Sequence, residues 1–265
     1  AMNFNGQYKL PKSAKNLFLL NYPPEVDMTE VLDANMANYF QPLIGVMRWM
    51  VEIGRIDIAM EISMLSSHLV MPHKWHLDCA LHMMTYLLKK HNSWLVFDPT
   101  YLDISWDAFK HNDWEEFYGP MTKALLPDAP EPLGKEVDTH MFVGSDHTDD
   151  KSNCKSWTGF MIFNNTALEV WFCKCQPTVE SSAFGAKFIA LKNSVETLRG
   201  LWYKLCMMGI PPSLVYGDNM LVIHNTQRPK SLLKKKCNSI CYHGVRESVA
   251  MGETLTTHVP TLENY

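Results

Sequence analysis

Val143–Gly144–Ser145–Asp146 is the stretch that decides the fold, because its pattern predicts a β-strand that ends in an exposed carboxylate. A second apolar stretch, Leu214–Val215–Tyr216–Gly217–Asp218, ends in the same way. If the two strands are neighbours, their carboxylates meet at one edge of a sheet. Carboxylates held there can bind Mg²⁺ beside a phosphodiester, where the metal activates water and neutralises the leaving oxygen. The two strands therefore predict a metal-dependent phosphodiester hydrolase, which also needs a third carboxylate.

The helix that should supply the third carboxylate is predicted from Ser182 to Met208. Its apolar residues recur at steps of three and four, so they form one face that packs on the sheet. These residues are Phe184, Phe188, Leu191, Val195, Leu198, Trp202 and Leu205. Lys187 lies on the flank of this face, where its side chain would face the ends of the two strands. We expect its ammonium to form an ion pair with Asp146 or Asp218, replacing the charge of a metal ion but not its chemistry.

Further strands and a helix complete an α/β pattern after residue 138. The predicted strands are Met141–Asp146, Trp157–Phe163, Ala167–Phe172, Leu214–Asp218 and Thr254–Val259, and a helix is predicted near Asn238–Met251. This order favours a mixed five-stranded sheet covered by helices. We expect residues 139–265 to form this domain.

The chain before residue 139 divides into two predicted regions. Residues 1–90 contain three amphipathic helical segments between residues 36 and 90, which predict a small bundle. Residues 91–138 form an aromatic and acidic insertion that ends in a Pro-rich linker. The aromatic residues could bind a protein partner or stack on bases, but the acidity would repel a phosphate backbone. Packing on a neighbouring domain is the favoured interpretation.

Composition limits the class of protein. The net charge is −4, but residues 139–265 carry 13 Lys and Arg against 10 Asp and Glu. A cluster formed by Lys230, Lys234, Lys235 and Lys236 could contact phosphates, although a solvated loop is the simpler reading. The seven scattered cysteines favour reduced thiols, and hence the cytoplasm or nucleus. No apolar run is long enough to predict a membrane span.

Several motifs resemble the ribonuclease H region of Copia-type retrotransposon polyproteins. They are, in chain order, Gly144–Ser145–Asp146–His147, Ser156–Trp157–Thr158–Gly159–Phe160, Cys175–Gln176–Pro177–Thr178–Val179–Glu180–Ser181–Ser182, Gly217–Asp218–Asn219 and Tyr242–His243–Gly244–Val245–Arg246–Glu247. Upstream, Phe40–Gln41–Pro42–Leu43–Ile44–Gly45, Arg55–Ile56–Asp57–Ile58–Ala59 and Leu65–Ser66–Ser67 resemble the segment that closes the reverse transcriptase. The resemblance implies a thumb- or connection-like helical region before a ribonuclease H-like α/β domain. It includes no paired-Asp polymerase strand, so we expect a reverse transcriptase fragment that does not polymerise.

The resemblance also implies roles for individual residues. Asp146 and Asp218 match family carboxylates that hold Mg²⁺ or Mn²⁺ for hydrolysis of the RNA strand of an RNA–DNA hybrid. Lys187 falls on the position of the family's Glu. The family's fourth carboxylate lies in a helix after the last strand, and the sequence stops at Tyr265 before such a helix. We therefore expect a protein of ribonuclease H-type endonuclease ancestry that is catalytically inactive and binds no metal.

Three alternatives to a hydrolase remain open, one of which is a structural subunit of a polymerase-like assembly. The domain could be a non-catalytic module that binds an RNA–DNA hybrid or another nucleic acid. Its candidate phosphate contacts are Lys234, Lys235, Lys236, His243 and Arg246. The domain could instead bind a protein partner through residues 91–138.

Overall fold

The structure is a computed structural model that describes residues 16–17, 23–101, 103, 107, 109, 112–121, 137–148, 150–206, 213–233 and 236–260. The chain divides into two compact units, residues 1–95 with 150–153, and residues 96–149 with 154–265. Each unit has its own apolar core. Neither the Pro-rich run at residues 127–132 nor Lys234 and Lys235 lies within the described residues. The division at residues 90 and 138 stays a prediction.

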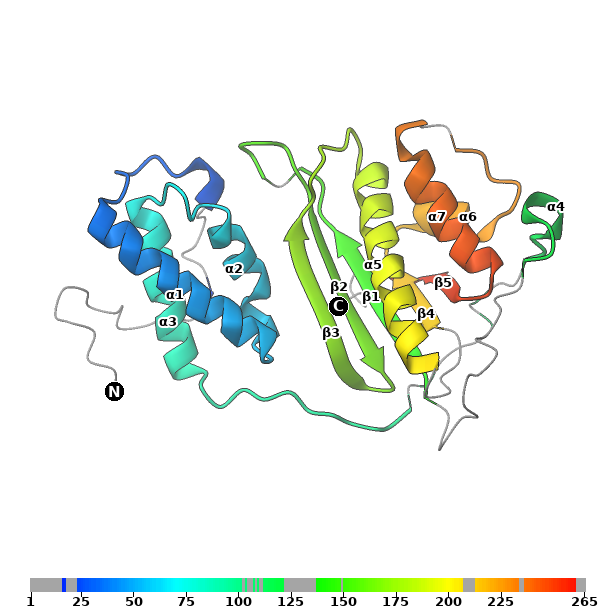
Figure 1. Cartoon of the computed structure of the whole chain (residues 1–265), viewed down its shortest axis with the longest axis horizontal. Helices are drawn as coiled ribbons and strands as arrows, with labels where there is room; N and C mark the ends of the chain where they lie inside the picture. Colours follow the sequence, from blue (N-terminus) through cyan, green and yellow to red (C-terminus); the bar gives the residue numbers. More distant parts are fainter. Residues whose placement is uncertain are drawn as a thin grey trace. The chain divides into compact units, whose positions relative to one another are not determined.

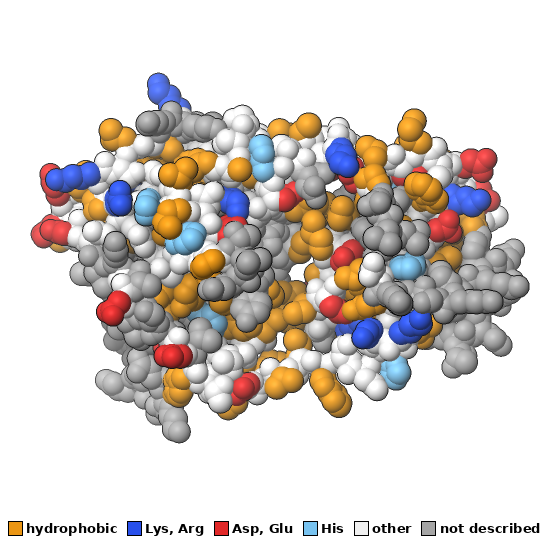
Figure 2. Space-filling view, turned by 180° about the vertical axis from the view of Figure 1, so that it is seen from behind, with side chains coloured by type: hydrophobic (Ala, Val, Ile, Leu, Met, Phe, Trp, Pro, Cys, Tyr) orange, Lys and Arg blue, Asp and Glu red, His pale blue; other side chains and the backbone are white. Residues whose placement is uncertain are grey.

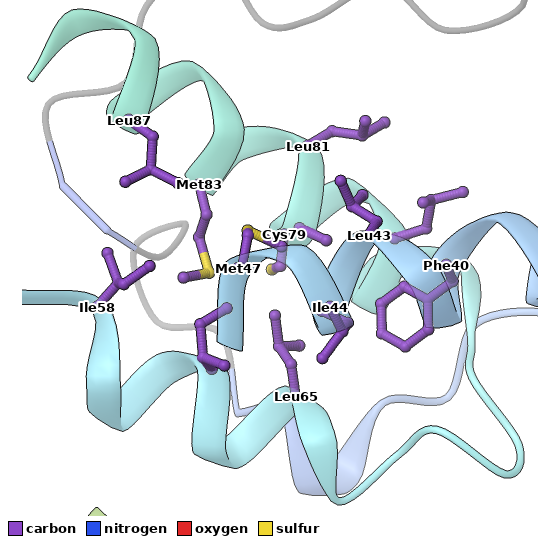
Figure 3. Packing of buried hydrophobic residues seen from close by; sticks show 13 residues of the cluster. Phe40, Leu43, Ile44, Met47, Ile58, Leu65, Cys79, Leu81, Met83 and Leu87 are labelled. Carbon is purple, nitrogen blue, oxygen red and sulfur yellow. The ribbon is translucent and has the colours of Figure 1, made fainter. Parts of the chain in front are cut away.

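The first unit is a bundle of three helices, as the sequence predicts. These are α1 (Ala34–Glu52), α2 (Ala59–Ser66) and α3 (Lys74–Lys89), with short 3-10 turns at Pro24–Val26 and Ile56–Ile58. Asp33 caps α1 by accepting a hydrogen bond from the Met36 N–H at 2.8 Å. Figure 3 shows side chains of the three helices pointing toward one another around Met47, Leu65 and Met83.

The second unit contains a mixed five-stranded sheet in the order β3-β2-β1-β4-β5. The strands are β1 (Thr139–Ser145), β2 (Trp157–Asn164), β3 (Ala167–Cys175), β4 (Ser213–Gly217) and β5 (Thr254–His258). β1 and β2, and β2 and β3, pair antiparallel, whereas β1 and β4, and β4 and β5, pair parallel. β1 is thus central, and the predicted ribonuclease H-like α/β fold is confirmed.

Helices α5 (Ala183–Cys206), α6 (Met220–Gln227) and α7 (Ser239–Ala250) share one apolar core with the sheet. Figure 1 shows α5 running alongside β1 and β4. Buried residues of α5 pack on Met141 and Val143 of β1 and on Val215 of β4. The predicted apolar face of α5 is confirmed, because Phe188, Leu191, Val195, Leu198, Trp202 and Leu205 are all buried.

The opposite face of the sheet carries an aromatic cluster that includes the buried His140. Phe142 and Tyr216 stack at 5.0 Å between ring centroids, and Phe109 of the insertion lies 5.6 Å from Tyr216. The insertion also makes hydrogen bonds to the turn between β2 and β3, where the Thr166 N–H donates to the Thr100 carbonyl at 3.2 Å. The described residues of the insertion from 96 onward therefore belong to the sheet unit. It includes the short helix α4 (Glu115–Tyr118).

Candidate functional site

Asp146 and Asp218 follow the C-terminal ends of two neighbouring parallel strands. β1 and β4 are paired in the register Val143 with Gly217, so both strands deliver their carboxylates to the same edge of the sheet. Both residues are partly buried. This is the edge at which the sequence places a candidate metal site.

Lys187 reaches this edge from α5 and binds Asp218. Its Nζ donates to Oδ1 of Asp218 at 2.6 Å and to Oδ2 at 2.5 Å. The Lys187 side chain is 20% exposed and that of Asp218 is 12% exposed, so the ion pair is largely shielded from water. Lys187 lies one residue before the buried Phe188, which places it on the flank of the core face. The predicted salt bridge to one of the two aspartates is present.

Asp146 has a different partner at the start of β2. Its Oδ1 accepts a hydrogen bond from the backbone N–H of Trp157, which closes the loop between β1 and β2. The same loop is fixed by a hydrogen bond from the Thr148 N–H to the Ser156 hydroxyl at 3.1 Å. One oxygen of Asp146 thus holds the backbone of its own hairpin.

Three polar side chains near this edge were not singled out by the sequence. His258 Nε2 lies 3.2 Å from the Asp218 carbonyl oxygen, and His147 Nε2 lies 3.2 Å from the Glu180 carbonyl oxygen. Ser145 Oγ is buried without a hydrogen-bond partner among the described residues. It borders a cavity of about 20 Å³, also lined by Lys187 and Asp218, which is the size of one water molecule. Of these three residues, His147 could have been identified from the sequence, because it directly follows Asp146.

The charges and donors at this edge do not form a site for two divalent cations. Within the described ranges no group of three or more His, Cys, Asp or Glu side chains is arranged to hold one metal ion. Of the two aspartates, one is bound by an ammonium and the other by a backbone N–H. The residues present therefore do not fit the metal pair that hydrolysis requires.

The predicted phosphate-contacting residues are placed differently from one another. Lys236 and His243 are exposed, and so are Arg228 and Lys230 in the preceding segment. Arg246 is 3% exposed, and its guanidinium donates to the carbonyl oxygens of Pro229 and Ser231 at 2.5 and 3.1 Å. Both Nη atoms of Arg246 thus donate inside the fold, whereas its buried Nε has no hydrogen-bond partner among the described residues. The role of Arg246 as a phosphate contact stays a prediction. On the face in Figure 2, Lys and Arg side chains stand in small separate groups.

Part of the chain is similar to a retroelement polyprotein. No protein-family model matches the chain. The retrovirus-related Pol polyprotein from transposon RE1 of Arabidopsis thaliana is 24% identical over 131 residues, which are 48% of this chain and 9% of the polyprotein. The chain thus spans less than a tenth of the relative that it matches. No helix in the described part of the chain is long and apolar enough to cross a membrane.

Solved ribonuclease H structures are also similar to the chain. The N-terminal RNase H domain of a Mycobacterium tuberculosis protein has 12% identity and a TM-score of 0.39, covering 48% of this chain and 86% of that one. RNase H1 of Halobacterium salinarum has 14% identity and a TM-score of 0.37, covering 49% and 89%. The Copia type stays a prediction. The chain is thus similar in sequence to part of a retrotransposon polyprotein, and its sheet has the mixed five-stranded order that the ribonuclease H resemblance implies.

Proposed function

We propose that this chain is a ribonuclease H-like domain of retroelement descent. In it, the ammonium of Lys187 takes the place of the metal ions that hydrolysis requires. The observation that carries the proposal is the contact of one ammonium with both oxygens of Asp218. In this arrangement the carboxylate is neutralised by a fixed side chain. The domain therefore does not cleave the RNA strand of an RNA–DNA hybrid.

The size of the electrostatic effect supports loss of metal binding. Replacing a family Glu by Lys changes the local charge by two units at a site meant to hold dications. At an effective dielectric constant near 20, one unit charge about 4 Å away contributes about 4 kcal/mol. Half of that energy would lower metal affinity by more than about tenfold. Metal binding would also have to displace an ion pair that is only 20% and 12% exposed.

A titration of the whole chain with Mn²⁺ and Mg²⁺, combined with a hybrid-cleavage assay, tests the proposal. We expect wild type to show neither saturable heat of metal binding nor cleavage. Lys187→Glu should restore measurable Mn²⁺ binding, because it removes the ammonium and adds a ligand. Lys187→Met is the matched control, since it removes the ammonium without adding a ligand. Cleavage by wild type that is abolished in Asp146→Asn would refute the proposal.

A second candidate function is binding of an RNA–DNA hybrid without hydrolysis. It is favoured by exposed basic side chains that follow α6, namely Arg228, Lys230 and Lys236. If they contact phosphates, hybrid affinity falls steeply as salt rises, with a slope that decreases by about 0.9 for each contact removed. Lys230→Ala combined with Lys236→Ala should weaken binding at low salt. An unchanged salt slope in this double variant would rule out these contacts.

A further inference from the structure

Arg246 is a buried cation that the proposed site does not use. It lies on α7, is 3% exposed, and forms no ion pair with a carboxylate among the described residues. A buried charge is costly unless hydrogen bonds compensate for the lost water. Here the compensation comes from backbone carbonyls, because the guanidinium donates to Pro229 at 2.5 Å and to Ser231 at 3.1 Å.

Two of the carbonyls that Arg246 binds, those of Pro229 and Ser231, belong to the segment 228–233, which we name the basic loop. A third, that of Asn225, lies on α6 at 3.4 Å. The Tyr242 hydroxyl donates to the same Ser231 carbonyl, and the Ser231 hydroxyl donates to Oδ1 of Asn225 at 2.5 Å. Arg228 and Lys230, which flank the first bound carbonyl, are both exposed. The loop backbone is thus fixed from inside while its cationic side chains face solvent.

Two aromatic rings enclose the guanidinium of Arg246. Its Cζ lies 4.6 Å from the ring centroid of Tyr242 and 4.9 Å from that of Trp114. Such contacts between a cation and an aromatic face are favourable, and more so when the pair is shielded from water. Trp114 belongs to the insertion and is 7% exposed, so the insertion forms one wall of the arginine site.

The insertion is anchored on both sides of Trp114. Asn112 Nδ2 donates to the Gln227 carbonyl at 2.8 Å, next to the start of the basic loop. The Tyr118 hydroxyl lies 3.3 Å from His243 Nδ1 on α7. Segment 112–118 therefore bridges the end of α6 and the exposed side of α7.

We propose that Arg246, held between Tyr242 and Trp114, is a positioning residue that fixes the basic loop for contact with the phosphate backbone of an RNA–DNA hybrid. The inference rests on the second candidate function above. It gives segment 112–118 a defined role, because Trp114 completes the site around the Arg246 guanidinium. In the sequence, Trp114 lies 132 positions before Arg246. Residues 113, 115 and 116 are acidic and exposed, so the segment itself repels phosphate and acts only through the loop.

Fluorescence anisotropy with a labelled RNA–DNA hybrid, over a series of salt concentrations, tests this role in the full chain. Trp114→Ala should lower affinity at least about threefold and reduce the salt slope, although it removes no charge. Asn112→Ala is a milder second variant that loosens the same bridge, and it should act in the same direction. Trp94→Ala removes an exposed aromatic side chain outside the basic loop and its bridge, and is the matched control.

A double-mutant cycle separates positioning from general destabilisation. If Arg246 and Trp114 orient Lys230, then Lys230→Ala should cost less affinity in the Trp114→Ala background than in wild type. Additive effects, or higher affinity in Trp114→Ala, would overturn the positioning role while hybrid binding by wild type stands. Absence of salt-dependent binding by wild type would overturn both the second candidate function and this inference. Thermal unfolding of each variant confirms that the measured protein is folded.

Discussion

Residue 187 shows how one side chain changes the chemistry that a sheet edge can support. The strands still bring two aspartates to one edge, but Lys187 occupies both oxygens of Asp218. A metal ion at this position could exchange ligands and activate water, whereas an ammonium only donates hydrogen bonds. We expect the same contact to stabilise the fold, and measurements of unfolding test this.

We predict that Asp218→Asn lowers the free energy of unfolding by about 2 kcal/mol, because it leaves a largely shielded ammonium without its carboxylate. Urea denaturation measures this difference. Adding Lys187→Met to Asp218→Asn should recover part of the loss, since the uncompensated charge is then gone. The more exposed pair of Lys192 with Glu196 provides the control. Glu196→Gln should cost about 0.5 kcal/mol or less, and an equal cost for Asp218→Asn would contradict the prediction.

The sequence predicts the Lys187 ion pair but not which aspartate it binds. Helical periodicity places Lys187 beside the core face, and that information is local. The choice of Asp218 depends on the loop between β1 and β2, which returns the Trp157 N–H to Asp146. The surroundings of Arg246 were not predicted for a similar reason. Its i, i+4 spacing from Tyr242 was visible, but Trp114 and the Pro229 carbonyl come from distant parts of the chain.

At the scale of single elements, β1 has a different environment on each face. Met141 and Val143 pack against α5, and His140 and Phe142 point into the aromatic cluster. The alternation predicts a strand, yet it does not reveal that the second face is covered. Phe109 of the insertion supplies part of that cover, and its position was not predictable from local periodicity. His140 is consequently 2% exposed, and burial lowers the pKa of its imidazole to about 4.

The buried His140 predicts acid sensitivity of the sheet unit. Its pKa in the fold, about 4, lies below the ordinary value of 6.5, so the unfolded chain takes up the proton first as pH falls. The contribution of neutral His140 to stability is therefore complete above pH 6.5 and is lost between pH 6.5 and 4. The full loss is about 3 kcal/mol.

Urea denaturation at several pH values measures the effect of His140. His140→Phe fits the aromatic cluster, in which the ring of His140 stacks on Phe163 at 5.2 Å. This variant should be less sensitive to pH between 6.5 and 4 than wild type. His91→Phe, at an exposed histidine, should leave the pH dependence as it is in wild type. If both variants show the same pH dependence as wild type, burial of His140 is not the cause of the acid sensitivity.

At the scale of the whole molecule, the described residues form two separate apolar cores. One consists of residues from α1, α2 and α3, and the other joins the sheet to α5, α6 and α7. The sequence indicates both, because the period of apolar residues changes from helical before residue 91 to strand-like after residue 138. What the sequence does not reveal is the association of the insertion with the sheet, which depends on contacts between distant residues such as Asn112 and Gln227.

Two cores predict two unfolding transitions. Met47 in the first core and Leu198 in the second are almost completely buried, and truncation of either to Ala should cost about 2–5 kcal/mol in its own unit. Hydrogen exchange followed by mass spectrometry at increasing urea assigns each transition to peptides. Met47→Ala should lower the midpoint only for peptides of residues 34–89, and Leu198→Ala only for peptides of the sheet and its helices. If either substitution lowers both midpoints equally, the two cores unfold as one cooperative unit, which would contradict the prediction.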